Sequence, residues 1–297
     1  MKHSVMRKAE QGPAMVDGTA PARKAEPVQV ERSMTVAQGF ETIVGACLHH
    51  FQLNQPVVIN VRDVEALHQL RVAIRRLRSG LTLFRPAVAD HEFERLHGEL
   101  RWLMAESGDA RNLDVYLHCD LTHDQRSFVE NRRTDAYDRA ISALRSARCR
   151  RLMLDMVAWA SAGQWRENAV AAEPLGRFAN DRIVGLWSKV VDSRRLGALT
   201  DTQRHRLRIR VKKLRYALEF VDALHDRKTR RKRRFRRALK KAQDSLGDLH
   251  DMVTARSLVT LNSWLRGPDL SRKAQRRLVR DADRRLARLR DTDPYWN

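Results

Sequence analysis

The chain has 297 residues, and its 42% of hydrophobic residues suffice for one large globular domain or two modest ones. Its 58 Lys and Arg outnumber its 36 Asp and Glu, so the formal net charge is +22, which points to a polyanionic partner such as nucleic acid, an anionic membrane surface or a phosphate polymer. No apolar run approaches the roughly 20 residues of a membrane-spanning helix, and the N-terminus lacks the apolar core of a secretory signal. The dispersed Cys47, Cys119 and Cys149 fit a reducing compartment. We therefore expect a soluble, cytoplasmic protein.

Residues 1–33 combine Gly and Pro with small and charged residues, which predicts a disordered tail. Beyond them Pro is scarce, and apolar residues recur with the period of a helix. The sequence PVVIN at 56–60 is a short strand candidate that we interpret as a connector. The expected class is all-α, with antiparallel helical bundles. The predicted helices cover 34–53, 63–85, 90–107, 111–119, 123–160, 174–194, 201–225, 229–246, 249–265 and 271–290.

An internal repeat organises this map. The stretch LHQLRVAIRRLRSGL from Leu67 returns as RHRLRIRVKKLRYAL from Arg204, with His, basic and apolar residues at identical intervals. Further along, SGDARNLDV at 107–115 resembles LGDLHDMVT at 246–254, at nearly the same offset. Two matched blocks in the same order indicate a duplication, hence two pseudo-symmetric helical bundles. The predicted domain covers 34–297, with a first half at about 34–165 and a second at about 174–297.

Each copy of the repeat predicts a helix with two distinct faces. At 100° per residue, apolar residues form one stripe, and the His and basic residues form a row along one shoulder. We call these two rows the ladders; they are His68, Arg71, Arg75 and Arg78, and His205, Arg208, Lys212 and Arg215. A ladder rises about 15 Å, so it suits an elongated anion better than one compact phosphate. The alternative, a solvated flank covering the core, is less favoured because both copies keep the row. Arg76 and Lys213 lie across the wheel and are weaker candidates.

A second basic region, RKTRRKRRFRRALKK, lies at 227–241 and fits either a disordered interaction arm or a heavily charged helix. The second tier of candidate ligand contacts comprises the aligned pairs Arg95 with Arg234 and Arg101 with Lys240, followed by Arg237 and Lys241. The blocks at Gly108 and Gly247 predict helix boundaries, with Gly in the left-handed position after one helix and the following Asp capping the next.

Other chemistries find less support. No P-loop, GxGxxG or GxSxG motif occurs, and no residues assemble a nucleophile, base and oxyanion hole, so we expect no enzyme activity. The chain has eleven histidines, so an accessory protein that chelates metal or helps to process phosphate is an alternative hypothesis. Neither ladder histidine has a second ligand at suitable spacing on its own face, so we expect no metal and no cofactor. Weak, sequence-nonspecific nucleic-acid binding is the main alternative, although aromatics make up only 6% and no stacking series accompanies the ladders.

The four blocks, HQLRVAIRRLRSGLTLF with SGDARNLDV and HRLRIRVKKLRYALEF with LGDLHDMV, resemble the signature of the CHAD family, the conserved histidine α-helical domain. The resemblance covers about 34–290. It implies two helical bundles related by pseudo-twofold symmetry, with inorganic polyphosphate held by basic side chains in a central groove or pore. It also implies that polyphosphate granules are one place where such a protein is found.

Carried over residue by residue, the histidine and basic positions of this family coincide with the two ladders. The sequence departs from the family at Asn112, where the first glycine block usually has Asp, and at Ser107, where it usually has Leu. Many relatives carry a triphosphate-tunnel hydrolase domain, which does not fit in a tail of 33 residues. The resemblance therefore implies a stand-alone polyphosphate binder without enzymatic activity.

Overall fold

The structure, a computed structural model, describes residues 21–118, 121–225, 229–261 and 271–296. None of these residues belongs to a strand, so the predicted all-α class is confirmed. The helices are α1 Val36–Val61, α2 Val64–Val88, α3 His91–Glu106, α4 Gly108–Tyr116, α5 His123–Arg145, α6 Ala147–Ala162, α7 Leu175–Val191, α8 Asp201–Phe220, α9 Arg230–Leu261 and α10 Arg272–Arg290. Short 3-10 turns lie at Gln164–Glu167, Ala169–Ala172, Leu196–Ala198 and Asp222–Leu224.

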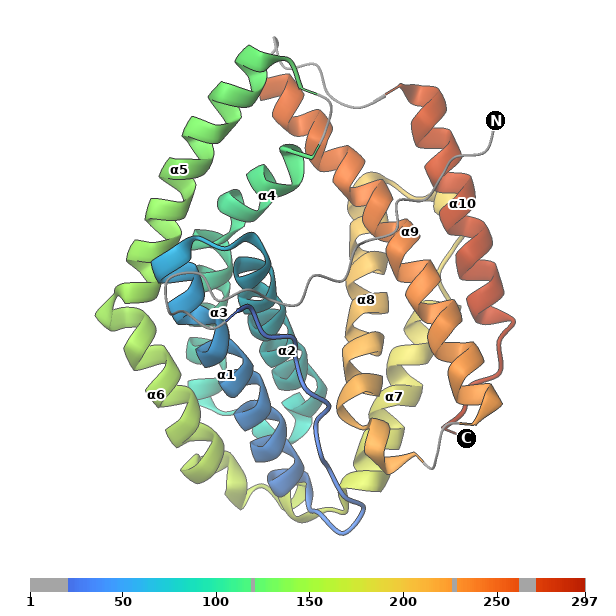
Figure 1. Ribbon diagram of the computed structural model, residues 1–297. Helices are drawn as coiled ribbons and strands as arrows, with labels where there is room; N and C mark the ends of the chain where they lie inside the picture. The colour runs from blue at the N-terminus through green and yellow to red at the C-terminus, as the bar shows by residue number, and fades with distance from the viewer. Residues whose placement is uncertain (1–20, 119–120, 226–228, 262–270, 297) are drawn as a thin grey trace.

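The helices form two groups, with α1 to α6 on one side of the molecule and α7 to α10 on the other (Figure 1). In the first group α1 packs along α2, and in the second α9 packs along α10. The two groups meet where α2 contacts α8, near the middle of the molecule (Figure 1). The helices that carry the two ladders are therefore neighbours. The duplication behind the two halves stays a prediction.

The apolar stripe of each ladder helix faces the core. In α2, Leu70, Ile74 and Leu81 are at most 1% exposed, and in α8 Val211 and Leu214 are fully buried. Burying one such side chain contributes about 1.5–3 kcal/mol. The stripes thus fix the rotation of α2 and α8, and with it the side of each helix on which the ladder lies.

The prediction of a disordered tail is wrong for residues 21–33, and residues 1–20 lie outside the described part of the chain. The extended segment buries Val28 and Val30, which are 4% and 2% exposed. The Asn54 side chain of α1 accepts a hydrogen bond from the Arg23 N–H at 3.0 Å and donates one to the Arg23 carbonyl at 2.9 Å. These contacts offset the entropy lost on ordering the segment, and its Pro-rich composition conceals them.

The predicted connector at 56–60 lies inside α1, which continues through Pro56. A proline in a helix interior removes a hydrogen bond and costs about 3 kcal/mol. Val57 and Val58 are buried in the core, which favours continuing the helix. The helix ends at Arg62, whose φ of 54° lies in the left-handed region.

Two other predicted helices have different boundaries. The predicted helix at 123–160 is interrupted by Ser146, whose extended backbone ends α5 and whose Oγ accepts a hydrogen bond from the Cys149 N–H at the start of α6. The predicted helices at 229–246 and 249–265 are one continuous helix, α9, which is described as far as Leu261.

Of the two helix boundaries predicted at the Gly-Asp blocks, the one at Gly108 is confirmed and the one at Gly247 is wrong, and the predicted capping is wrong at both. Gly108 begins α4 directly after the Ser107 junction, and Gly247 lies in the interior of α9. Neither glycine has the left-handed backbone that a C-terminal cap requires. Leu246 and Leu249 are buried on either side of Gly247, and their burial favours a helix that continues past this glycine.

Candidate functional site

The ladders of α2 and α8 lie near each other where the two helix groups meet. Burial lowers the pKa values of Arg208 and Lys212 on α8, and repulsion from Arg75 on α2 lowers both further. The cations on α2 and those on α8 are therefore close enough to repel one another. We call the eight ladder residues together the ladder surface.

The ladder surface contains buried donors without partners. Burying a charged donor without a hydrogen bond costs at least about 1–3 kcal/mol, so such groups are normally matched by water or by a ligand. Five ladder Nε atoms are buried and form no hydrogen bond with a described residue: those of Arg71, Arg75, Arg78, Arg208 and Arg215. The five side chains as a whole are only half-buried, so an anion between the ladders would meet their guanidinium groups from the exposed side.

Lys212 shows how strongly the site concentrates positive charge. Burial, followed by repulsion from Arg208, Arg75 and Arg215, lowers the pKa of Lys212 to about 7. Asp251 of α9 opposes this shift, but it does not cancel it. Near neutral pH the free protein therefore holds this lysine only partly protonated, and an anion would restore its charge.

Arg71 is held in place by the first helix group. Its Nη1 donates to the Met104 carbonyl at 2.8 Å and to Ser107 Oγ at 2.9 Å, at the end of α3. Burial is the main cause that lowers the pKa of Arg71 to about 10, and Arg75 and Arg111 add to it. One edge of this guanidinium is thus anchored to the protein, while its Nε lacks a partner among the described residues. Such anchoring reduces the entropy lost on binding.

The two ladder histidines lie beside basic or histidine neighbours. Burial lowers the pKa of His68 to about 4, and repulsion from Arg111 of α4 and from Arg75 adds to the effect. On α8, His205 Nδ1 lies 3.4 Å from Nδ1 of His250 on α9. The pKa of His205 is lowered as well, chiefly by burial. Both rings are therefore neutral near pH 7 and would become protonated more readily beside a polyanion.

A second group of basic residues surrounds Arg78, at the other end of the α2 ladder. Burial lowers the pKa of Arg78, and Arg101 of α3 lowers it further. Lys213 of α8, a weaker candidate from the sequence, also lies here, because burial and then Arg78 lower its pKa. His97 is influenced by the same three cations. Arg101 and Lys213 thus extend the ladder surface.

Arg76 is not available to a ligand. It is 1% exposed, and its Nε lies 3.0 Å from Glu219 Oε1 of α8, while its guanidinium packs over the Phe220 ring. Arg76, a weaker candidate from the sequence, is therefore a structural residue. It lies on a different side of α2 from the ladder, and this side faces the contact between α2 and α8.

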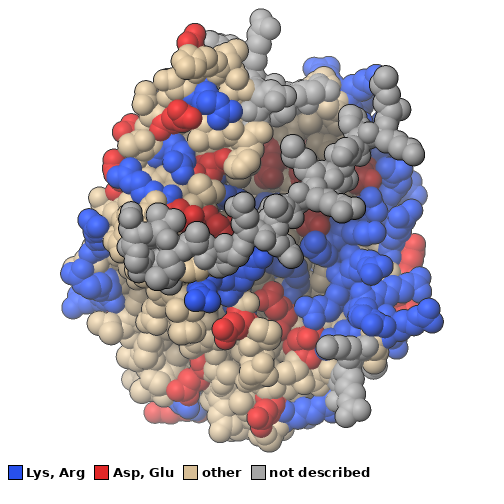
Figure 2. Space-filling view, viewed as in Figure 1, with Lys and Arg blue, Asp and Glu red and all other residues tan. Residues whose placement is uncertain are grey.

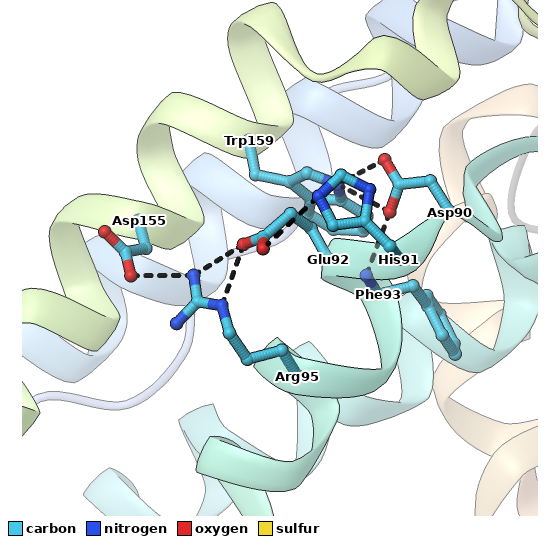
Figure 3. A network of polar contacts seen from close by, with 7 residues as sticks. All are labelled: Asp90, His91, Glu92, Phe93, Arg95, Asp155 and Trp159. Carbon is cyan, nitrogen blue, oxygen red and sulfur yellow. Dashed lines mark hydrogen bonds and ion pairs between the residues drawn. The ribbon is translucent and has the colours of Figure 1, made fainter.

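Arg95 likewise lies away from the ladders. Its guanidinium bridges Glu92 of α3 and Asp155 of α6, at 2.7 Å from Asp155 Oδ2 (Figure 3). Beside it, Asp90 caps α3 by accepting a hydrogen bond from the Phe93 N–H, and accepts another from the Trp159 indole. The repeat alignment placed Arg95 among the ligand contacts, but its two acidic neighbours give it a structural role instead.

The remaining candidates lie along α9, over which Lys and Arg gather on the right of the face shown in Figure 2. Arg234 and Arg237 line a depression formed with the C-terminal segment after α10. Lys240 lies 4.0 Å from Asp244, and Lys241 is exposed. The predicted arm at 227–241 is thus helical from Arg230 onward, and residues 226–228 lie outside the described part.

Three residues of the site were missed as candidates: Arg111, His97 and His250. The repeat contained a signal for two of them, since Arg111 and His250 occupy matching places in the two Gly-Asp blocks. Arg111 acts on His68, and the tilted rings of His250 and His205 have centroids 4.9 Å apart. No sequence pattern pointed to His97, whose approach to Lys213 is tertiary.

Within the described ranges, no three His, Cys, Asp or Glu side chains come together as metal ligands. In the same part of the chain, no helix is both long enough and apolar enough to cross a bilayer.

Comparison with known proteins agrees with this architecture. A family model described as CHAD domain matches residues 42–260, more than half of the chain. The crystal structure of the CHAD domain from the plant Ricinus communis is similar, with a TM-score of 0.72 and 27% identity over 93% of each chain. PptA from Streptomyces chartreusis shares the fold, with a TM-score of 0.54 and 17% identity, over 87% of this chain and 96% of that one. Among curated proteins none matches. Because the family model spans most of both helix groups and a CHAD crystal structure superposes on nearly the whole chain, the chain belongs to the CHAD domain family.

Proposed function

We propose that this protein binds inorganic polyphosphate on the ladder surface, between α2 and α8, without chemically altering it. The observation that carries the proposal is the set of five buried arginine Nε donors that have no partner among the described residues. The CHAD family is associated with polyphosphate binding, which supports the same ligand.

The chemistry of the surface fits a phosphate polymer better than a nucleic acid. Arginine binds phosphate oxygens through two parallel N–H donors, and lysine adds a compact charge. Single-stranded nucleic acids are usually held by aromatic side chains that stack on bases. The ladder surface is built from His, Arg and Lys, and Tyr216 beside Arg215 is buried at 3% exposure. A phosphate chain has no bases, so a protein can bind it with basic side chains and needs no aromatic side chains for stacking.

The extent of the two ladders supports one long anion as the ligand rather than separate phosphates. Each ladder extends about 15 Å along its helix. Arg75 acts electrostatically on residues of the opposite ladder, so the two rows lie within reach of one chain. Binding of this kind would also take the protein to polyphosphate granules.

The test is a competition titration at near-physiological salt. Labelled polyphosphate is displaced by unlabelled polyphosphate, duplex DNA or RNA at equal phosphate, for the native chain and for Arg75→Gln/Arg208→Gln. Arg71 is avoided because it also anchors the end of α3. Since hydrogen bonds to charged groups contribute about 1.5–3 kcal/mol each, we expect the double variant to lose at least about 100-fold in affinity.

The matched control is Arg276→Gln/Arg277→Gln on α10, which removes the same charge from exposed positions. The proposal requires this control to bind polyphosphate within about twofold of the native chain, since distant exposed charges are screened. Equal affinity of the ladder and control variants would reject the ladder surface as the site. Equal competition by DNA and RNA would reject polyphosphate as the preferred ligand.

A further inference from the structure

A depression on the N-terminal half of α9 holds a second concentration of positive charge. It has a volume of about 780 Å³, and Thr292 and Asp293, which follow α10, contribute to its lining. The arginines that line it are Arg230, Arg231, Arg233, Arg234 and Arg237. Five arginines and one carboxylate therefore surround a single hollow, on the face where Figure 2 shows Lys and Arg gathered over α9.

The charge in this depression is not balanced within the described part of the chain. None of the five arginines forms an ion pair with a described residue, and Asp293 forms none either. The neighbouring basic residues on the other side of α9 behave differently. Lys232 lies 2.9 Å and Arg236 3.0 Å from Asp222 Oδ1. The same helix thus pairs the cations that face its own helix group and leaves those in the depression for an anion from outside.

One edge of the depression, at Arg233 and Arg237, lies on the side of α9 that approaches the ladder surface, whereas Arg234 and Arg231 lie about 100° and about 160° around the helix from Asp251. With 100° between successive residues, Arg233, Arg237 and Asp251 fall within about 40° of one another on the helix. Asp251 is the residue whose charge acts on Arg208 and Lys212 of the ladder. One side of α9 therefore runs from the depression to the ladder surface.

The two basic regions are nevertheless separate. From Arg234 to Asp251, α9 rises about 25 Å. Asp244, Asp248 and Asp251 occupy the turns between them, and the pKa of Asp248 is raised by burial and by its acidic neighbours. These carboxylates repel an anion, so the positive charge does not form one unbroken track.

We propose that the depression on α9 is a second polyphosphate site and that one long chain occupies it together with the ladder surface. This inference rests on the proposed function. A chain whose contour is shorter than about 25 Å can fill one site at a time, given the rise of the helix between them. A longer chain that fills both gains from the high effective concentration of its second segment. The protein would therefore select long polyphosphate over short.

The test compares short polyphosphate, with a contour below about 25 Å, and polyphosphate several times longer, on the native chain and on Arg233→Gln/Arg234→Gln/Arg237→Gln. We expect this variant to lose at least about tenfold in affinity for the long chain and to stay within about twofold for the short chain. The control Arg276→Gln/Arg277→Gln/Arg280→Gln removes three exposed arginines from α10 and should change neither affinity.

Three results would overturn the second site. The variant could bind long chains like the native protein, or it could lose short and long chains in equal proportion. It could also lose duplex DNA or RNA while keeping polyphosphate of both lengths, which would make the depression a nucleic-acid site. The ladder variant Arg75→Gln/Arg208→Gln keeps the two proposals distinguishable, because a loss of short-chain affinity in this variant but not in the depression variant assigns short chains to the ladder surface.

Discussion

Arg75 and Arg76 are adjacent in α2, yet they belong to opposite kinds of surface. Arg76 is buried, pairs with Glu219 of α8 and stacks on Phe220. Arg75 is half-buried, has a buried Nε without a described partner and faces further cations on α8. The same two helices thus hold one positive charge that stabilises their contact and a row of positive charges that opposes it. The difference shows that the contact between α2 and α8 uses the charge of Arg76 and does not need that of Arg75.

The largest expected effect on stability comes from breaking the ion pair between Arg76 and Glu219. Glu219→Gln leaves the buried Arg76 charge without its counter-ion, and removing one member of a buried pair typically costs about 3 kcal/mol. Urea denaturation of the ligand-free protein measures this loss. The control Arg76→Met/Glu219→Gln removes the charge as well and should recover most of the lost stability. Equal stability of Glu219→Gln and the native chain would mean that the pair contributes nothing to the contact between α2 and α8.

A smaller effect concerns the pH dependence of binding. The pKa of Lys212 is about 7 in the free protein, lowered by burial and by Arg208, Arg75 and Arg215, and Asp251 raises it only in part. A bound polyanion raises this pKa, so binding takes up a proton above about pH 7. The contribution of Lys212 to affinity is therefore constant below this pH and falls above it, by at most about tenfold per pH unit until the pKa of the bound state is reached.

Titration of polyphosphate affinity between about pH 6 and about pH 9 checks this expectation. Lys212→Arg supplies the control, because an arginine stays charged over this range and should give a flatter profile. Identical slopes for the native chain and Lys212→Arg would show that Lys212 does not exchange its proton on binding.

The smallest expected effect is a gain in stability when Arg75 of the ladder surface is replaced. In the ligand-free protein, Arg75→Gln relieves repulsion with Lys212 and Arg208 and should raise the free energy of unfolding by about 0.5 kcal/mol. With saturating polyphosphate the order reverses, because the variant binds less tightly and gains less stability from the ligand. Thermal unfolding with and without polyphosphate would show this crossover. A variant less stable in both conditions would place Arg75 among the structural residues.

The sequence predicted the ladder helices because their apolar stripes follow the helix period over many residues. Leu70 and Val211 are buried as that period requires, so the opposite shoulder carries the cations. The partners of single charged residues were not predictable in this way. Arg76 and Arg75 are equally basic, and only the approach of Glu219 from α8 separates their roles.

Helix ends were harder to predict than helix faces. Gly247 looked like a boundary because glycine favours caps, but the burial of Leu246 and Leu249 keeps it within α9. The alignment that paired Arg95 with Arg234 matched residue types, and it contained no information on Asp155, which binds Arg95 from α6. The site was therefore predicted where it depends on local periodicity and missed where it depends on packing between distant helices.

The extended segment at 21–33 has a consequence for the order in which the protein folds. Its residue Arg32 donates a hydrogen bond from Nε to the carbonyl of Leu224 at 2.9 Å, across a sequence separation of 192 residues. Contacts between such distant positions slow folding, because a long loop must close before they form. During synthesis, this segment and the first helix group leave the ribosome before Leu224 does. The segment therefore cannot complete its contacts until Leu224 has been synthesised and has emerged. The Arg32 end of the segment is thus among the last parts of the chain to form its contacts, although its Arg23 end binds Asn54 within the first helix group.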